Sequence, residues 1–188
     1  MVITFGLWVG ALQTAGPQEQ SKRLPRFEDY PITEVFQGKP HRPILKTPEQ
    51  RRYRTRIRQG VEKGWGVWIN GEWGKEQNRP GPNFAGHYVV VVWGCGSCCL
   101  MMAVADVETG EVFNPPLSTN NSLHVPSLVL PPSAGSAAVV RYRKDSRLIV
   151  IKSTPHFEYP NPKSYAFYFL LQDNQWKLLR RVRIKGDP

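Results

Sequence analysis

The amino-acid sequence predicts an α+β fold: a single domain dominated by an antiparallel β-sheet of about seven strands, with one basic helix on its N-terminal side. Two patterns lead to this class: a helix-capping pattern in residues 47–50, and short apolar runs after residue 83 that are separated by turn residues. A chain of 188 residues with 40% apolar side chains is long enough for one self-supporting core. The composition excludes fibrous and disordered classes, and no internal repeat is visible.

The N-terminal segments are predicted to lie outside the folded core. Residues 3–12 are an apolar run followed by small and polar residues, so residues 1–16 are interpreted as a signal segment for export. The run is shorter than the ~20 residues that a helix needs to span a bilayer. Residues 17–46 are rich in proline without a sustained period and are expected to form an extended arm, which leaves residues 47–188 as the domain.

A helix is expected directly after the arm. Residues 47–50 place Thr at the N-cap, Pro at the first helical position and Gln at the third, which is the arrangement of a capping box. Apolar residues then recur at every fourth position: Tyr53, Ile57 and Val61. This narrow stripe predicts one buried face and leaves the intervening arginines exposed. Either Gly60 or Gly64 is expected to end the helix.

Strands are expected over residues 84–93, 100–107, 111–114, 137–142, 147–152, 165–171 and 176–184. The first two contain near-continuous apolar runs, which indicate central strands covered on both faces. Residues 64–82 hold three tryptophans and an Asn-Gly turn signal, and are interpreted as a lid over the core, with a ligand platform as the alternative. Residues 115–132 are expected to be a long loop, and Asp173 and Asn174 to form the turn of the last hairpin.

Two motifs begin ten residues apart: Asn83–Tyr88, which reads N-F-A-G-H-Y, and Trp93–Cys99, which reads W-G-C-G-S-C-C. With these motifs, and with the segments Arg54–Arg58, Asp106–Gly110 and Asp145–Leu148, the chain resembles an uncharacterised family of small exported bacterial proteins over most of residues 50–184. The resemblance implies export and a common fold, and it implies no activity. In the family pattern the second cysteine follows the first by four places, which corresponds to Cys99 and leaves Cys98 as an addition.

The three cysteines of the second motif admit three interpretations. A disulfide between Cys95 and Cys99 would hold the turn between two strands and contribute ~2 kcal/mol for so short a loop. A redox pair of Cys95 and Cys98 would need a helix that begins at the cysteines, as in thioredoxin-type sites, whereas the following residues suit a strand. A metal site would need three thiolates with His87, but adjacent cysteines in extended chain point to opposite faces. No metal or cofactor is therefore predicted.

The first motif is expected to serve structure, with no catalytic residue assigned. Within one strand, His87 and Cys95 would be about 26 Å apart at ~3.3 Å per residue, too far for a base and its nucleophile. His87 shares its strand face with apolar residues, which favours a buried, hydrogen-bonded histidine. Gly86 is expected to let another segment approach closely. Asn83 and Trp93 complete the set of structural residues in the two motifs.

Charge is distributed in blocks along the chain. Residues 22–63 and 136–188 each carry a net charge of +7, whereas residues 64–135 carry −3. This pattern predicts one basic face built from the helix and the last strand, with these arginines as binding residues: Arg51, Arg54, Arg58, Arg180, Arg181 and Arg183. The expected function is a secreted or periplasmic binding domain for an anionic polymer of the cell envelope or a protein partner. A thiol-disulfide oxidoreductase that uses Cys95, Cys98 or Cys99 is the alternative.

Overall fold

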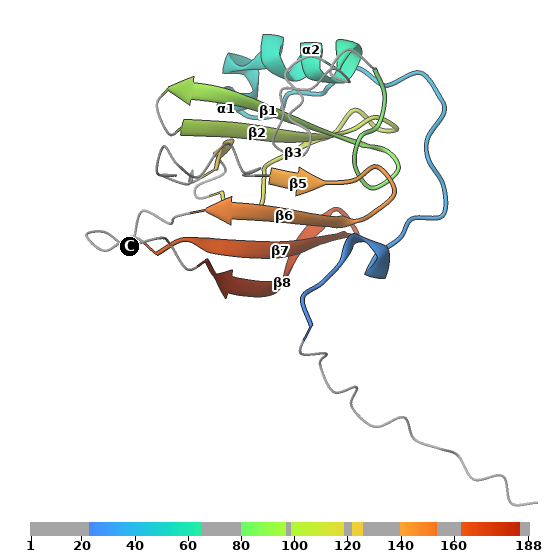
Figure 1. The fold of residues 1–188 in the computed structure, drawn as a ribbon. Helices are drawn as coiled ribbons and strands as arrows, with labels where there is room; N and C mark the ends of the chain where they lie inside the picture. Colours follow the sequence, from blue (N-terminus) through green and yellow to red (C-terminus); the bar gives the residue numbers. More distant parts are fainter. Residues whose placement is uncertain are drawn as a thin grey trace, which may run out of the picture.

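The computed structural model describes residues 23–64, 80–96, 99–118, 122–125, 140–153 and 163–184. Two four-stranded antiparallel sheets are stacked face to face, and two short helices cover the outer face of the first sheet (Figure 1). This arrangement confirms an α+β fold that is dominated by antiparallel strands. The predicted signal segment and most of the predicted lid, residues 65–79, lie outside the described residues.

The predicted helix is present as two consecutive helices, α1 (Pro48–Arg52) and α2 (Arg54–Lys63). The expected capping box is formed: the backbone N–H of Gln50 donates to Thr47 Oγ1, and the side chain of Gln50 accepts from the N–H of Thr47. Gly64 ends α2 in a left-handed conformation. Gly60 has a different role, because a Cβ there would lie 2.5 Å from methyl groups of Val91, so it lets α2 pack closely on the sheet. In the described ranges, neither helix has the length and apolar character to cross a membrane.

The first sheet is built on a long hairpin of β1 (Tyr88–Gly96) and β2 (Cys99–Asp106). The short strands β3 (Val112–Phe113) and β4 (His124–Val125) both pair with β2. β4 lies inside the segment expected to be a loop. Among the described strands β1 pairs with β2 alone, so its continuous apolar run reflects burial of both faces rather than a central position in the ladder.

The second sheet follows the chain order β5-β6-β7-β8. Its strands are β5 (Val140–Tyr142), β6 (Leu148–Ser153), β7 (Tyr165–Gln172) and β8 (Gln175–Arg183). Asp173 and Asn174 both adopt positive φ, 49° and 59°, and form the predicted two-residue turn between β7 and β8. All four strands therefore agree in place with the sequence-based expectation, with ends that differ by up to three residues.

Two apolar cores hold the layers together. On one face of β1 and β2, every second residue, such as Val90 and Met102, packs with Ile149 and Phe169 of the second sheet to form the core between the sheets. On the other face of β1, residues such as Val91 pack with Ile57 and Val61 of α2. The apolar stripe predicted for the helix is thus buried against the first sheet.

The arm before α1 runs along one side of both sheets (Figure 1). It begins beside the second sheet with a short 3-10 helix, η1 (Phe27–Asp29), and ends at the first sheet, where Ile44 forms a bridge with Glu111. Between these points the N–H of Ile32 donates to the carbonyl of Asp145, and that of Phe36 donates to Gly86. The arm therefore joins the two sheets at the edge where the pocket described below is found.

Candidate functional site

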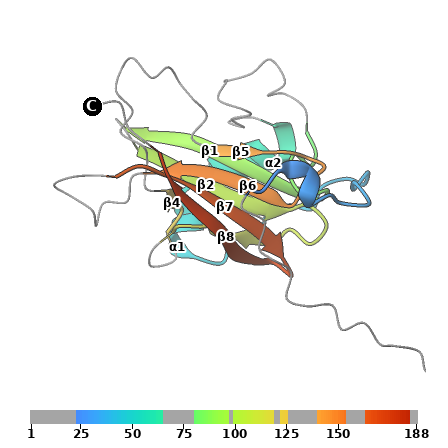
Figure 2. The same cartoon turned by 60° about the horizontal axis from the view of Figure 1, so that its bottom comes forward.

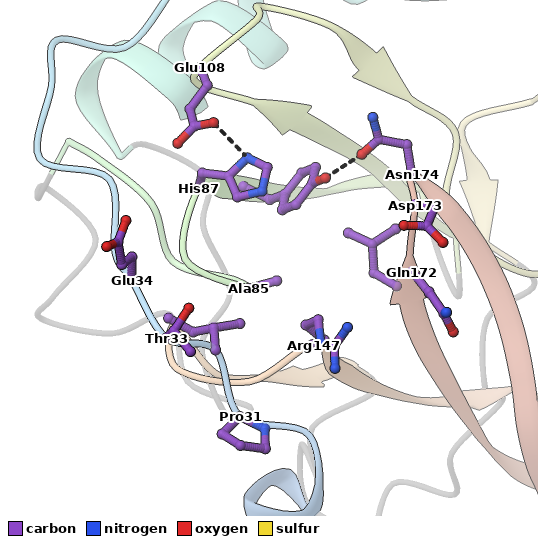
Figure 3. Close-up of a pocket in the computed structure, with 13 residues that line it drawn as sticks. Pro31, Thr33, Glu34, Ala85, His87, Glu108, Arg147, Gln172, Asp173 and Asn174 are labelled. Atoms are coloured by element: carbon purple, nitrogen blue, oxygen red, sulfur yellow. Dashed lines mark hydrogen bonds and ion pairs between the residues drawn. The ribbon is translucent and has the colours of Figure 1, made fainter.

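A pocket of about 530 Å³ lies at one end of the stacked sheets (Figure 3). Five segments meet there: arm residues 31–34, the turn that precedes β1 together with the first residue of β1, the turn that follows β2, the residue before β6, and the end of β7 with the β7–β8 turn. These segments are far apart in the sequence. Figure 2 shows the same layers from a second direction, with the strands of the two sheets crossing one above the other.

The N-F-A-G-H-Y motif forms the wall of this pocket at the start of β1. Phe84 and Tyr88 pair across a tight turn in which Ala85 and Gly86 have positive φ values of 43° and 81°. The N–H of Gly86 donates to the carbonyl of Lys144, and a Cβ at Gly86 would collide with the carbonyl oxygen of Glu34. The close approach expected at Gly86 is therefore observed, and it holds the arm and the second sheet against the motif.

His87 and two carboxylates form one corner of the pocket. The pairing of Tyr88 with Asp106 brings the end of β2 beside the start of β1. His87 Nδ1 lies 3.0 Å from Asp106 Oδ1 and 3.8 Å from Glu108 Oε2. The side chain of His87 is 31% exposed, that of Asp106 only 4% and that of Glu108 49%. His87 is therefore hydrogen-bonded as expected, but it lines a pocket instead of being fully enclosed in the core.

Asp106 is fixed by hydrogen bonds from its own turn. Oδ1 accepts from the backbone N–H of Glu108 at 2.8 Å, and Oδ2 accepts from Thr109 Oγ1 at 2.9 Å. Burial on its own would raise the pKa of Asp106, but the hydrogen bonds from His87, Glu108 and Thr109 together outweigh burial and lower this pKa below its ordinary value. Asp106 is consequently an ionised carboxylate held in one orientation.

Tyr88 joins the two sheets across the pocket. Its hydroxyl donates to Asn174 Oδ1 on the β7–β8 turn, as the dashed line in Figure 3 marks. Burial, and then the nearby carboxylates Asp106, Glu108 and Glu111, raise the pKa of Tyr88 to about 12. The phenol therefore stays protonated and remains a hydrogen-bond donor at neutral pH.

The pocket is acidic although the chain as a whole is basic. Three exposed carboxylates line it, those of Glu34, Glu108 and Asp173, and the buried Asp106 lies behind them. Arg147 is the one arginine or lysine among the lining residues, and Figure 3 shows it on the side opposite His87 and Glu108. The formal net charge of the chain is +10. The pocket is thus a local region of negative potential with a single cationic group opposite its His87 corner.

Two other motif residues are embedded in the structure. The side-chain amide of Asn83 donates to the carbonyl of Val90 and accepts from its N–H, at 3.1 and 2.8 Å, so Asn83 satisfies backbone groups of β1. Trp93 is 5% exposed and packs on Tyr53, with 5.5 Å between ring centroids. Both contacts hold β1 in place, one at its edge and the other against the helical layer.

The cysteine motif lies at the opposite end of β1 from the pocket. β1 is continuous from Tyr88 to Gly96, so the predicted separation of His87 from Cys95 is maintained. Cys95 is exposed, and the side chains of residues 96–99 lie outside the described ones. A disulfide between Cys95 and Cys99, with Cys98 as the odd thiol, remains a prediction. A strand, β2, begins at Cys99, where a thioredoxin-type site would need a helix.

The arginines predicted to bind do not form one face. α2 covers the outside of the first sheet and β8 is the far edge of the second, so the two basic elements lie on opposite sides in Figure 1. Blocks of charge in the sequence do not report which side of a fold each block occupies. Several of the arginines contact the chain itself: Arg51 donates to the carbonyl of Lys46, Arg180 to that of Arg23, and Arg181 lies over the ring of Tyr165. Arg58, expected outside, is partly buried.

Sequence reasoning assigned no site role to five residues: Glu34, Glu108, Arg147 and Asp173, which line the pocket, and Asp106 beside it. The spacing of Asp106 and Glu108 in the turn after an apolar strand was the available signal, because a hairpin returns that turn to the start of the preceding strand. Arg147 and Asp173 carry no such signal. Comparisons of the chain with protein-family models, curated proteins and solved structures found no match.

Proposed function

We propose that this chain is an exported binding domain whose ligand site is the pocket between the two sheets, and that the ligand is a small molecule with a cationic and an anionic group. The observation that carries the proposal is the contrast between the acidic pocket and the net charge of +10. A volume of about 530 Å³ is within the range of small-molecule sites, ~300–1,000 Å³. Export is proposed from the N-terminal apolar run and from the resemblance described above.

The charges of the pocket define the ligand chemistry. Glu34, Glu108 and Asp173 favour an ammonium or guanidinium group, because all three are exposed acidic residues that line the pocket. Among the described residues Arg147 hydrogen-bonds only through its backbone, to Tyr30 and Leu171, so its guanidinium is free to receive a carboxylate or phosphate. A zwitterion such as an amino acid or a short peptide satisfies both sides.

The proposed ligand site is this pocket, in place of the basic face that the sequence predicted as a binding surface for an anionic polymer. Polymer binding dominated by counterion release needs several cationic groups along one surface. The arginines of α2 and β8 lie on opposite sides of the molecule. A binding function is retained, and its location moves from the arginine-rich exterior to the inter-sheet pocket.

The proposal is tested by calorimetric titration of the full chain, in the presence of a chelator, with L-lysine, 1,4-diaminobutane and L-glutamate. L-lysine is expected to bind more tightly than either of the others, because only L-lysine combines a carboxylate with an excess of positive charge. Arg147→Gln and Asp173→Asn are expected to weaken L-lysine binding by about tenfold or more, since a charged hydrogen bond contributes ~1.5–3 kcal/mol.

Matched substitutions outside the pocket serve as controls: Arg183→Gln on β8 and Glu62→Gln on α2, both of which replace exposed charges. Neither is expected to change the affinity for L-lysine. Equal weakening by pocket and control substitutions would assign the binding to overall charge. Absence of binding for all three compounds at millimolar concentration would contradict the proposed ligand class.

A further inference from the structure

We propose that the corner formed by His87, Asp106 and Glu108 binds one divalent cation of the first transition row, with Nδ1 of the histidine and one oxygen of each carboxylate as ligands. The potential ligand atoms of these three residues all lie within 4.8 Å of one another. The corner belongs to the pocket described above, yet the cation needs no organic ligand, so this site can be tested independently of the proposed function.

The distances already approach those of a coordination sphere. Bonds of ~2.0–2.2 Å place neighbouring ligand atoms about 3 Å apart and opposite ones about 4.3 Å apart. His87 Nδ1 lies 3.0 Å from Asp106 Oδ1 and 3.8 Å from Glu108 Oε2. Figure 3 shows Glu108 and His87 turned toward each other at the edge of the pocket. A small rotation of the exposed Glu108 side chain would bring its carboxylate oxygen to coordination distance of an ion held by His87 and Asp106.

The most buried ligand is also the most firmly held. Asp106 keeps its orientation through the N–H of Glu108 and the hydroxyl of Thr109, which are the outer-shell contacts that a metal-ligating carboxylate requires. The carbonyl of His87 accepts from the N–H of Val107 at 2.9 Å, so the backbones of the first and second ligands are tied together. One ligand is therefore preorganised, and the two others are at the pocket surface, where an ion can enter.

The local charge favours a cation. Asp106 and Glu108 share their turn with a third carboxylate residue, Glu111, whose carbonyl accepts from the N–H of Asp106 at 2.9 Å. A divalent ion brings two positive charges to this group of carboxylates. The pocket beside the corner leaves room for water or a ligand group in the remaining coordination positions.

The donor set selects the class of metal. One imidazole nitrogen with two carboxylate oxygens suits Mn²⁺, Fe²⁺, Co²⁺, Ni²⁺ and Zn²⁺. Ca²⁺ and Mg²⁺ prefer oxygen ligands alone, and Ca²⁺ takes six to eight of them. We therefore expect a clear preference for Mn²⁺ and Zn²⁺ over Mg²⁺.

The test is a titration of the chelator-treated full chain with Mn²⁺ alone. Electron paramagnetic resonance measures the concentration of free Mn²⁺ at each step. Mn²⁺ is the first probe because it binds thiols weakly and so avoids the cysteine motif. One equivalent of Mn²⁺ is expected to bind. Zn²⁺ should compete with Mn²⁺ for the site, whereas a large excess of Mg²⁺ should not. Glu108→Gln and His87→Gln are each expected to weaken Mn²⁺ binding tenfold or more.

Two controls isolate the corner from other charges. Glu111→Gln removes a carboxylate of the same turn that pairs with Lys46, and His124→Gln removes a histidine of β4, which pairs with Met101 near the opposite end of β2. Both are expected to leave Mn²⁺ binding within twofold. Glu108 is exposed, so Glu108→Gln keeps the test decisive even if His87→Gln is unstable. No binding at 1 mM Mn²⁺ or Zn²⁺, or binding that both corner variants retain, would overturn this site while leaving ligand binding in chelator unaffected.

Discussion

The two ends of strand β1 are built in different ways. At its start, the N-F-A-G-H-Y motif contacts the arm, the β5–β6 connection and the end of β2 through backbone hydrogen bonds. At its end, Gly94 and Cys95 are exposed, and the strand turns directly into β2. The start therefore depends on segments distant in the sequence, whereas the end is determined by a local hairpin. The candidate site lies where distant segments meet.

The glycines at these ends show the difference. Gly86 has a φ of +81° and lies against the backbone of Glu34, so a side chain there meets both strain and collision. Gly94 has no atom within 4 Å of the position that a Cβ would occupy. Gly86, in the turn before β1, and Gly94, near the end of β1, thus have opposite tolerance for a methyl group.

The largest effect is expected for Gly86→Ala. Left-handed backbone and overpacking each cost ~1–3 kcal/mol, so the free energy of unfolding should fall by about 3–4 kcal/mol. Gly94→Ala is the matched control, and it should change the free energy of unfolding by less than ~0.5 kcal/mol. Urea unfolding of both variants measures the difference. Similar values for the two would show that the start of β1 is no more constrained than its end.

The next effect is expected for Asp106→Ala. This substitution leaves the Glu108 N–H, the Thr109 hydroxyl and His87 without their acceptor, and should lower the free energy of unfolding by about 2–3 kcal/mol. Thermal and urea unfolding without added metal measure it. Thr109→Val removes only one of these bonds and should cost about 1 kcal/mol. A stable Asp106→Ala variant would mean that the turn after β2 holds its shape without the carboxylate.

A smaller effect is expected at the cysteine end. β1 has an irregularity between Gly94 and Gly96, and Gly96 pairs with Cys99, so Cys95 lies beside Cys99 across the hairpin. If Cys95 and Cys99 are bonded, Cys99→Ser should lower the free energy of unfolding by ~2 kcal/mol. Cys98→Ser should leave it unchanged. Mass spectrometry of the unreduced protein identifies the pair, and a Cys95–Cys98 peptide would refute this assignment.

The smallest effect is expected for Asn83→Ala, at about 1–2 kcal/mol in the free energy of unfolding for two lost hydrogen bonds. Its more specific readout is amide hydrogen exchange. The N–H of Val90 donates to the Asn83 side chain, and its exchange should accelerate in the variant. The N–H of Val150, in the second sheet, serves as the reference. Equal acceleration at both positions would indicate a global loss of stability in place of a local one.

Local patterns were sufficient for most secondary structure. The capping box at Thr47, the apolar stripe through Ile57 and Val61, and the turn at Asp173 and Asn174 all appear where the sequence predicts them. Each depends on interactions between residues a few positions apart. The start of β1 was predicted four residues too early, since Phe84 is apolar but belongs to a tight turn that only contacts with the arm and the second sheet explain.

The sequence by itself determined the class of fold, the helix and its buried face, and the extended strand that separates His87 from Cys95. Only the tertiary structure decided that the strands divide into two stacked sheets, that the basic elements lie on opposite sides, and that Asp106 and Glu108 lie beside His87. The physical reason is the sequence separation over which each kind of interaction acts. Hydrophobic periodicity and capping act within one element, whereas the pocket and its charges depend on how elements far apart in the chain are packed together.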